Sequence, residues 1–290
     1  MNQKTARPLM FLAMLIFGTI GLLVRSIPLP SSIIALTRGS VGCVFLLLLM
    51  QLQKRRPDTA AIRKNLRWLL PAGAFLGFNW ILLFESYRYT SVAVGTLCYY
   101  MAPILVVLTS PALLHERLTA RKLICVLLAL VGMVGVSGVV QSGLPSPSET
   151  TGILLGLAAA VLYACIVLLN KQLADISAYD RTVVQLGVCA VVMLVYCAAT
   201  VPLAELKFAP ATVGLLLVAG VLHTGVTYYL YFGSMAYLSG QTAAILSYVD
   251  PVVAVLVSVL VLAEPMHPVE LLGAALVLGA ALASELEKPA

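Results

Sequence analysis

Charged residues are scarce in this sequence. Asp, Glu, Lys and Arg make up 10% of its 290 residues, whereas 61% are hydrophobic and the mean hydropathy is +1.02. Soluble domains carry about 25% charged residues and roughly 45 to 50% apolar ones. A chain with so little charge cannot cover a water-facing surface. The composition therefore excludes a soluble protein and indicates that the chain lies in the lipid bilayer.

Side chains that could bind a metal or perform catalysis are also few. The sequence has three His, and "HERL" lacks the second His of a zinc-protease helix. The six Cys all fall within apolar stretches without metal-ligand spacing, so we expect free thiols. We find no nucleophile placed with a base, and we predict no enzyme, metal site or cofactor. A polytopic receptor or intramembrane enzyme is the alternative of a different class, although the short loops offer no signalling surface.

Long apolar runs are abundant, and a membrane-spanning helix needs about 20 such residues. The first run lacks a small-residue cleavage site before "RSIPLP" and another run follows at once, so we expect a retained helix. The last run is the weakest, with fourteen uncharged residues from Leu271 to Ser284, a length that also suits a buried or interfacial segment. The sequence thus predicts an all-α integral membrane protein with ten transmembrane helices, near residues 8–25, 31–52, 68–87, 91–113, 123–141, 152–170, 182–203, 211–233, 240–263 and 269–284.

Lys and Arg are distributed unevenly among the predicted loops. With both termini in the cytoplasm, 14 of the 18 basic residues fall in cytoplasmic segments, as the positive-inside rule requires. Outside lie Arg25, Arg88 and Lys207, and Arg38 falls within a span. The net charge of +6 therefore indicates topology, and we expect no nucleic-acid partner.

A motif occurs twice at a constant offset. "YMAPILVVLTSPALLHE" runs from Tyr100 to Glu116, and "YVDPVVAVLVSVLVLAE" runs from Tyr248 to Glu264, 148 residues later. The offset predicts two five-helix units, residues 1–142 and 150–285, around a central cavity. Because five crossings are an odd number, the second unit is inverted relative to the first. Inverted repeats are typical of transporters that work by alternating access. We expect the two Glu residues to cap or brace helix ends near opposite membrane faces.

Pro103 and Pro251 occupy the same place in the two copies of the motif. Each lacks a backbone N–H and clashes with the preceding helical turn, so we expect kinks in mid-membrane. The kinks are either hinges beside a wet cavity or packing features without a function.

Polar and aromatic side chains recur at helical spacing within the spans. Lipid disfavours hydroxyls and amides, so we expect these side chains to face the cavity and bind substrate. We assign Tyr87, Tyr89, Tyr179 and Tyr237, which lie near helix ends, to interfacial belts instead. The candidate substrate-binding residues are Asn79, Trp80, Tyr99, Tyr100, Tyr163, Tyr228, Ser247 and Tyr248.

Three ionisable side chains within the spans have two interpretations each. Asp250 either receives a substrate ammonium or a proton, or it satisfies donors at the kink. Arg38 either neutralises Asp250 or binds a carboxylate, or it extends its side chain toward the outer face. His223 is either a coupling site or a hydrogen-bonded packing residue.

The repeated motif, its continuations "PMHPVELLGAALVLGA" and "RLTARKLICVLLALVGMVGV", and the first span "LIFGTIGLLVRS" carry a family resemblance. Over nearly its whole length the chain resembles EamA-type members of the drug/metabolite transporter superfamily, and it is most similar to the YddG-type exporters of aromatic and other neutral amino acids. The family often has Trp before the Gly of the first span, where this chain has Phe17.

The resemblance implies a multi-pass transporter in a bacterial inner membrane that exports small metabolites, with amino acids as the small-molecule substrates. We expect it to function as a monomer. Carriers of phosphorylated metabolites or small drugs are the competing interpretation. A phosphate carrier needs several basic side chains at its site, and the candidates here are Arg38 and Lys171.

Overall fold

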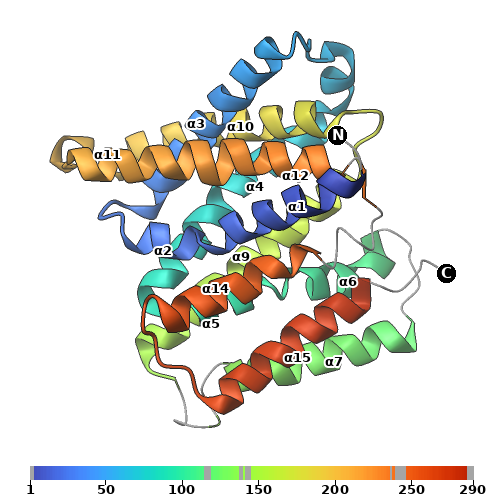
Figure 1. Ribbon diagram of the computed structural model, residues 1–290, viewed down its shortest axis with the longest axis vertical. Helices are drawn as coiled ribbons and strands as arrows, with labels where there is room; N and C mark the ends of the chain where they lie inside the picture. Colours follow the sequence, from blue (N-terminus) through green and yellow to red (C-terminus); the bar gives the residue numbers. More distant parts are fainter. Residues whose placement is uncertain are drawn as a thin grey trace.

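The structure is a computed structural model that describes residues 3–113, 119–136, 140, 145–235, 237–238 and 246–285. All regular secondary structure in these residues is helical, and the helices form one elongated bundle (Figure 1). The helices are α1 (Gln3–Gly18), α2 (Ile20–Arg25), α3 (Ser31–Leu52), α4 (Thr59–Tyr89), α5 (Val92–Tyr99), α6 (Ala102–Leu113), α7 (Ala120–Val136), α9 (Pro147–Lys171), α10 (Ala178–Thr200), η1 (Leu203–Glu205), α11 (Pro210–Leu217), η2 (Val218–Val226), α12 (Thr227–Met235), α14 (Val249–Leu260) and α15 (Pro268–Glu285).

The all-helical membrane architecture is confirmed, and the count of ten helices stays a prediction. In the described part of the chain, seven helices are long and apolar enough to cross a membrane. Three shorter apolar helices occupy the other predicted spans, namely Leu123–Val136, Val249–Leu260 and Pro268–Ala283. The predicted span at 240–263 begins in residues outside the described ranges, so its full length is not defined.

Side chains at the helix starts explain several of the boundaries. Asp58, Ser91 and Ser177 each accept a hydrogen bond from the backbone N–H three residues on. Ser146 forms a capping box with Glu149, whose carboxylate accepts from the Ser146 N–H at 2.9 Å. These caps satisfy amide donors that a helix leaves without partners at its first turn.

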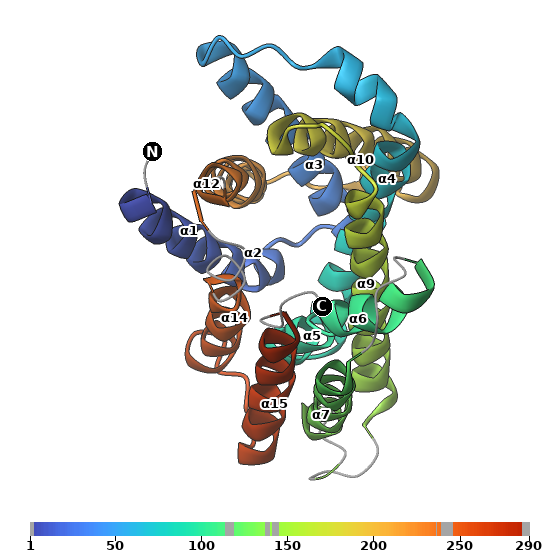
Figure 2. The same ribbon diagram turned by 90° about the vertical axis from the view of Figure 1, so that its right-hand side faces the viewer.

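Several contacts that a helix of one half makes are repeated by the equivalent helix of the other half. In the first half α1 packs against α12 and α14, and in the second half α9 packs against α4, α5 and α6. Likewise α3 packs against η2, and α10 packs against α4. The pairs α3 with α10 and α7 with α15 join equivalent helices; Figure 2 shows α1 against α14 and α15 beside α7. Each of these contacts thus has a counterpart when the halves are exchanged, as expected for two related repeats.

Glycines allow the close approach of α7 and α15. A methyl group on Gly273 would lie 2.6 Å from the carbonyl oxygen of Gly132 and 2.8 Å from the amide nitrogen of Val136. These are backbone atoms, which cannot rotate away as a side chain can. The two backbones therefore touch at this point, an arrangement that small residues permit in membranes.

Gly273→Ala is expected to lower the melting temperature of the purified protein, because it separates α7 from α15 at a cost of about 1 to 3 kcal/mol. Gly279→Ala on the same helix is the matched control, since its added methyl group would lie within 4 Å of no atom beyond the adjacent backbone of its own helix. Alanine is the better helix former by about 1 kcal/mol, so the control is expected to be neutral or stabilising. Equal melting temperatures for both variants would contradict the close contact.

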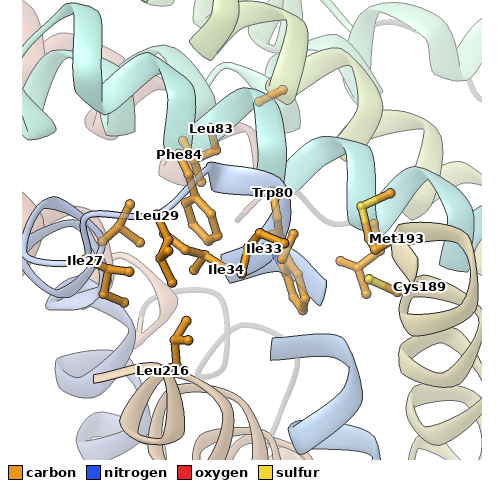
Figure 3. Packing of buried hydrophobic residues seen from close by; sticks show 14 of the residues in the cluster. Ile27, Leu29, Ile33, Ile34, Trp80, Leu83, Phe84, Cys189, Met193 and Leu216 are labelled. Atoms are coloured by element: carbon orange, nitrogen blue, oxygen red, sulfur yellow. The ribbon is translucent and has the colours of Figure 1, made fainter. Parts of the chain in front are cut away.

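The largest buried cluster lies where α3, α4, α10 and α11 meet. Figure 3 shows Trp80 and Phe84 of α4 projecting toward Ile33 and Ile34 of α3, with Met193 of α10 beside them. These side chains are all at most 5% exposed. This packing fixes the rings that reappear in the candidate site.

Candidate functional site

Both copies of the repeated motif break their helix at the tyrosine. Tyr100 follows α5 with φ −71° and ψ 3°, and Tyr248 precedes α14 with φ −75° and ψ −6°. The two backbones thus have nearly the same conformation, 148 residues apart. Pro103 and Pro251 follow three residues later, where a missing N–H removes the usual helical donor. Breaks beside both prolines are therefore present, and motion about them stays a prediction.

A hydrogen bond between the two halves connects these breaks. The Tyr100 hydroxyl donates to the Asp250 carboxylate at 2.9 Å. The Tyr100 and Tyr248 ring centroids lie 6.2 Å apart, and on the other side Tyr99 lies 6.1 Å from Tyr100 and 5.2 Å from Tyr163. Four of the predicted tyrosines therefore form one continuous aromatic group, with a single carboxylate attached to it.

The first helix approaches the backbone of Asp250 closely. A methyl group on Gly18 would lie 2.6 Å from the backbone oxygen of Asp250 and 2.5 Å from the Val253 side chain. Phe17, the residue before this glycine, lies 5.5 Å from the Tyr228 ring and 6.3 Å from the Tyr231 ring, measured between centroids. Phe17 of α1 thus packs against the aromatic rings of α12.

Arg38 forms a second part of the site on α3. Its guanidinium carbon lies 4.2 Å from the centroid of the Trp80 ring and 5.4 Å from that of Phe84. Its Nε donates to the Thr224 hydroxyl at 3.1 Å, and that hydroxyl donates to the Ala219 carbonyl at 3.1 Å. Arg38 is 4% exposed, so the expectation that its side chain extends to the outer face is wrong. Ring stacking and the threonine hold it inside the bundle.

The single acid and the buried base are near each other without forming an ion pair. Arg38 and Asp250 are close enough to interact electrostatically. Among the described residues, however, no carboxylate oxygen lies within 4.0 Å of the Arg38 nitrogens. Tyr99 also interacts electrostatically with both charges. The site therefore contains an acid that is bonded to a tyrosine and a base that is stacked on a tryptophan.

Several of these side chains are half-buried, namely Tyr99, Tyr100, Tyr228 and Asp250. A cavity of about 410 Å³ lies at the bundle end that holds Arg25 and Arg88, and Phe84 and Tyr87 line it. Phe84 thus contacts Arg38 and also lines this cavity.

His223 lies on η2, a nine-residue π-helix within the continuous segment from α11 to α12. Its Nε2 is 3.0 Å from the Thr19 hydroxyl at the junction of α1 and α2. The ring is 4% exposed. This contact joins η2 to the junction of α1 and α2. A role for His223 in coupling stays a prediction.

Asn79 is not part of the aromatic group. It is fully buried where α4 meets α9, and its side-chain amide donates to the Ala159 carbonyl at 2.6 Å. Ser247 and Tyr248 lie at the second break, and Trp80 and Tyr228 lie nearer to Arg38. The structure therefore brings most of the predicted substrate-binding residues together in two adjoining groups and leaves Asn79 between packed helices.

Two aromatic residues near the site were missed or misassigned from the sequence. Tyr87 was assigned to an interfacial belt, which is wrong, because it is 2% exposed and its hydroxyl is 3.1 Å from that of Thr96. Phe84, which lies one helical turn after Trp80, is not among the residues predicted from the sequence. The spacing of Trp80, Phe84 and Tyr87 along α4 places them on one face and was the available signal.

Known proteins resemble this chain over both halves. The profile of the EamA-like transporter family matches residues 5–138 and again residues 150–284. The uncharacterized transporter YxxF of Bacillus subtilis is 28% identical over 256 residues, which is 88% of this chain and 81% of that protein. An uncharacterized transporter of Archaeoglobus fulgidus is 26% identical over 272 residues, 93% of each chain. One crystal structure shares the fold, with a TM-score of 0.68 and 19% identity over 97% of each chain.

The family match accounts for the repeated motif and for the exchange pattern of the helix contacts. It covers most of the chain and occurs once in each half. The chain therefore belongs to the EamA-like transporter family and is a multi-pass membrane transporter.

Proposed function

We propose that this transporter exports small neutral amino acids, with aromatic ones among them, by alternating access between its two halves. The observation that carries the proposal is that one acid, Asp250, is bonded to the group of tyrosine rings, while one buried base, Arg38, is stacked on Trp80 and interacts with that acid electrostatically. An amino acid carries both charges, and its side chain contacts the rings. Each aromatic contact contributes about 0.5 to 1.5 kcal/mol, and an ammonium on a tyrosine face a similar amount.

The break in each repeat supports the mechanism. The Tyr100–Asp250 bond joins the first half to the second beside both breaks. A rocking motion of one half against the other changes the contacts at this point first, and Pro103 and Pro251 act as the hinges. The proposal further assigns residues 1–142 and 150–285 to inverted five-helix repeats, ten helices in total, as in transporters with a site at the membrane midplane.

The arrangement of charges supports a cytoplasmic location for both termini. The pairs Arg55–Asp180 and Lys64–Asp175 lie where α3 ends and α4 and α10 begin, next to most of the basic loop residues. The Arg25–Glu264 pair lies at the opposite end. We place the first end in the cytoplasm of a bacterium and the chain in its inner membrane, as a functional monomer.

A reporter fused after Lys288 tests this orientation. Alkaline phosphatase at that position is expected to be inactive and a fluorescent protein bright, because both termini are cytoplasmic. A second fusion within the loop between α10 and α11, after Lys207, is expected to give the reverse pattern. An active phosphatase after Lys288 would contradict the inverted arrangement, since the two halves would not cross ten times in all.

Counterflow in proteoliposomes tests the function. Liposomes that contain purified protein and unlabelled amino acids are expected to accumulate labelled phenylalanine, tyrosine, threonine or methionine, and protein-free liposomes are not. Competition by unlabelled amino acids would establish the substrate class. Folded protein that gives no counterflow with any of the four would exclude the proposal and favour phosphorylated metabolites or small cationic drugs, which are tested in the same assay.

A further inference from the structure

We infer that Arg38 binds the carboxylate of the substrate, so that a free carboxylate is required for recognition. This inference rests on the proposed function and specifies which part of the cargo is read by which side chain. Its evidence is the burial, the stacking and the hydrogen bonding of Arg38.

The guanidinium is buried, and no acid among the described residues forms an ion pair with it. Arg38 is 4% exposed, and in the described part of the chain every ion pair involves other residues. Arginine keeps its charge in proteins, so it cannot become neutral as a buried lysine can. A charged side chain within a membrane helix is costly unless it is paired. An anionic ligand supplies the missing counter-charge.

One edge of the guanidinium is fixed and the other is available. Nε donates to Thr224, and the plane lies against the Trp80 ring. Within the described residues, the two terminal nitrogens have no hydrogen bond to protein. Those nitrogens present a fork of parallel donors, which matches the two oxygens of a carboxylate. The ring and the threonine thus hold the fork in place before a ligand arrives.

The surrounding backbone is shaped to hold this arginine. Thr224 lies on the π-helix η2, a type of irregularity that is frequent at functional sites. A methyl group on Gly42 would lie 2.5 Å from the Thr224 side chain, so glycine at this place lets α3 approach η2 closely enough for the bond to Arg38. Thr224 and Gly42 are therefore positioning residues for the guanidinium.

The charges nearby favour a carboxylate over a phosphate. A phosphate ester carries nearly two negative charges and is usually held by several basic groups. Here a single guanidinium is accompanied by Asp250, which interacts with it electrostatically. A second negative charge on the ligand would be repelled by that acid, whereas an ammonium group on the same ligand would be attracted. The arrangement fits a monocarboxylate with an amine.

Binding measurements on purified full-length protein in lipid nanodiscs test this inference. Trp68 and Trp80 are the two tryptophans, so Trp68→Phe leaves Trp80 as a fluorescent reporter in contact with Arg38. The probes are phenylalanine, 3-phenylpropionate without the amine, phenethylamine without the carboxylate, and inorganic phosphate.

Three variants are compared in this background: Arg38→Gln, Arg38→Lys and Arg55→Gln. Arg55 is the matched control, since it also lies over a ring, 4.9 Å from that of Tyr179, but has Asp180 within 4.0 Å.

Arg38→Gln is expected to weaken phenylalanine and 3-phenylpropionate binding roughly 10- to 100-fold, as loss of a charge-assisted hydrogen bond does. Phenethylamine binding is expected to change less than threefold. Arg38→Lys keeps the charge without the fork and is expected to give an intermediate loss. Arg55→Gln is expected to match the parent protein. If Arg38→Gln does not fold, Arg38→Lys and Thr224→Val serve as the test, with Thr224→Ser expected to restore binding.

The outcomes separate this inference from the proposed function. If Arg38 variants bind both carboxylates as tightly as the parent does, or if the parent prefers phenethylamine, the inference is wrong even when amino acids are transported. Arg38-dependent binding of inorganic phosphate in place of both carboxylates also overturns it. If amino acids fail in counterflow but 3-phenylpropionate binds through Arg38, the proposed function is wrong and the carboxylate site stands.

Discussion

Asp250→Asn is expected to reduce counterflow of phenylalanine roughly 10- to 100-fold, with unchanged protein abundance in the membrane. In the parent protein the Tyr100 hydroxyl donates a hydrogen bond to Asp250 at 2.9 Å. Asparagine has nearly the same shape as aspartate and keeps an oxygen that can accept this hydrogen bond. We therefore expect the fold to be preserved and the variant to remove only the charge that, under the proposed function, attracts the substrate ammonium. Initial rates of labelled phenylalanine uptake at matched protein content measure the effect.

Two controls make this result specific. Asp175→Asn removes an exposed acid that pairs with Lys64 at the bundle end, and it is expected to leave counterflow unchanged. Uptake or binding of 3-phenylpropionate, which lacks the ammonium, is expected to be insensitive to Asp250→Asn. A variant that transports phenylalanine normally would leave Asp250 with a scaffold role at the kink. Equal losses for phenylalanine and 3-phenylpropionate would indicate damage to the site as a whole.

Glu264→Ala is expected to lower the free energy of unfolding by about 2 to 4 kcal/mol, the largest loss of stability among the proposed variants. Its carboxylate accepts from the Val92 N–H at 3.0 Å and from the Ser258 hydroxyl, and it pairs with Arg25 at 2.8 Å. The side chain is 12% exposed, so its removal leaves buried donors without a partner. Thermal unfolding of purified protein, followed by loss of the monodisperse peak in gel filtration, measures the effect.

Glu85→Ala is the matched control for Glu264→Ala. Glu85 pairs with Arg88 at 3.8 Å, and both side chains are more exposed, at 28% and 43%. Exposed pairs of this kind contribute about 0 to 1 kcal/mol. Glu264→Gln, which keeps an acceptor for Val92 without the charge, is expected to fall between the two. If Glu264→Ala and Glu85→Ala melt at the same temperature, Glu264 does not hold the helices together.

Glu264 also shows how far the repeat could be interpreted without coordinates. The sequence predicted that the glutamate ending each motif caps or braces a helix end, and Glu264 does cap α5. The partner helix could not be predicted, because Val92 and Arg25 come from distant parts of the chain. The other glutamate, Glu116, lies outside the described residues, so its role stays a prediction.

The positions of charged and aromatic side chains were harder to predict than the helices. Tyr87 lies near the end of its helix in sequence and was assigned to the membrane interface, yet it is buried against Thr96. Position near a helix end does not show whether a side chain faces lipid or a neighbouring helix, and here Tyr87 faces α5. Arg38 shows the same limit, because a long flexible side chain can reach the surface or stack on a ring from the same backbone position.

Hydrophobicity and repetition in the sequence determined the solvent, the helical architecture and the two-part organisation. Those features follow from local rules, because every backbone group in lipid must be paired within a helix and an apolar run of sufficient length meets that need. Only the tertiary structure decided that Tyr100 meets Asp250, that Trp80 supports Arg38 and that Asn79 lies between helices. These contacts depend on helix rotation and close packing, which are set by glycines and side chains far apart in the chain.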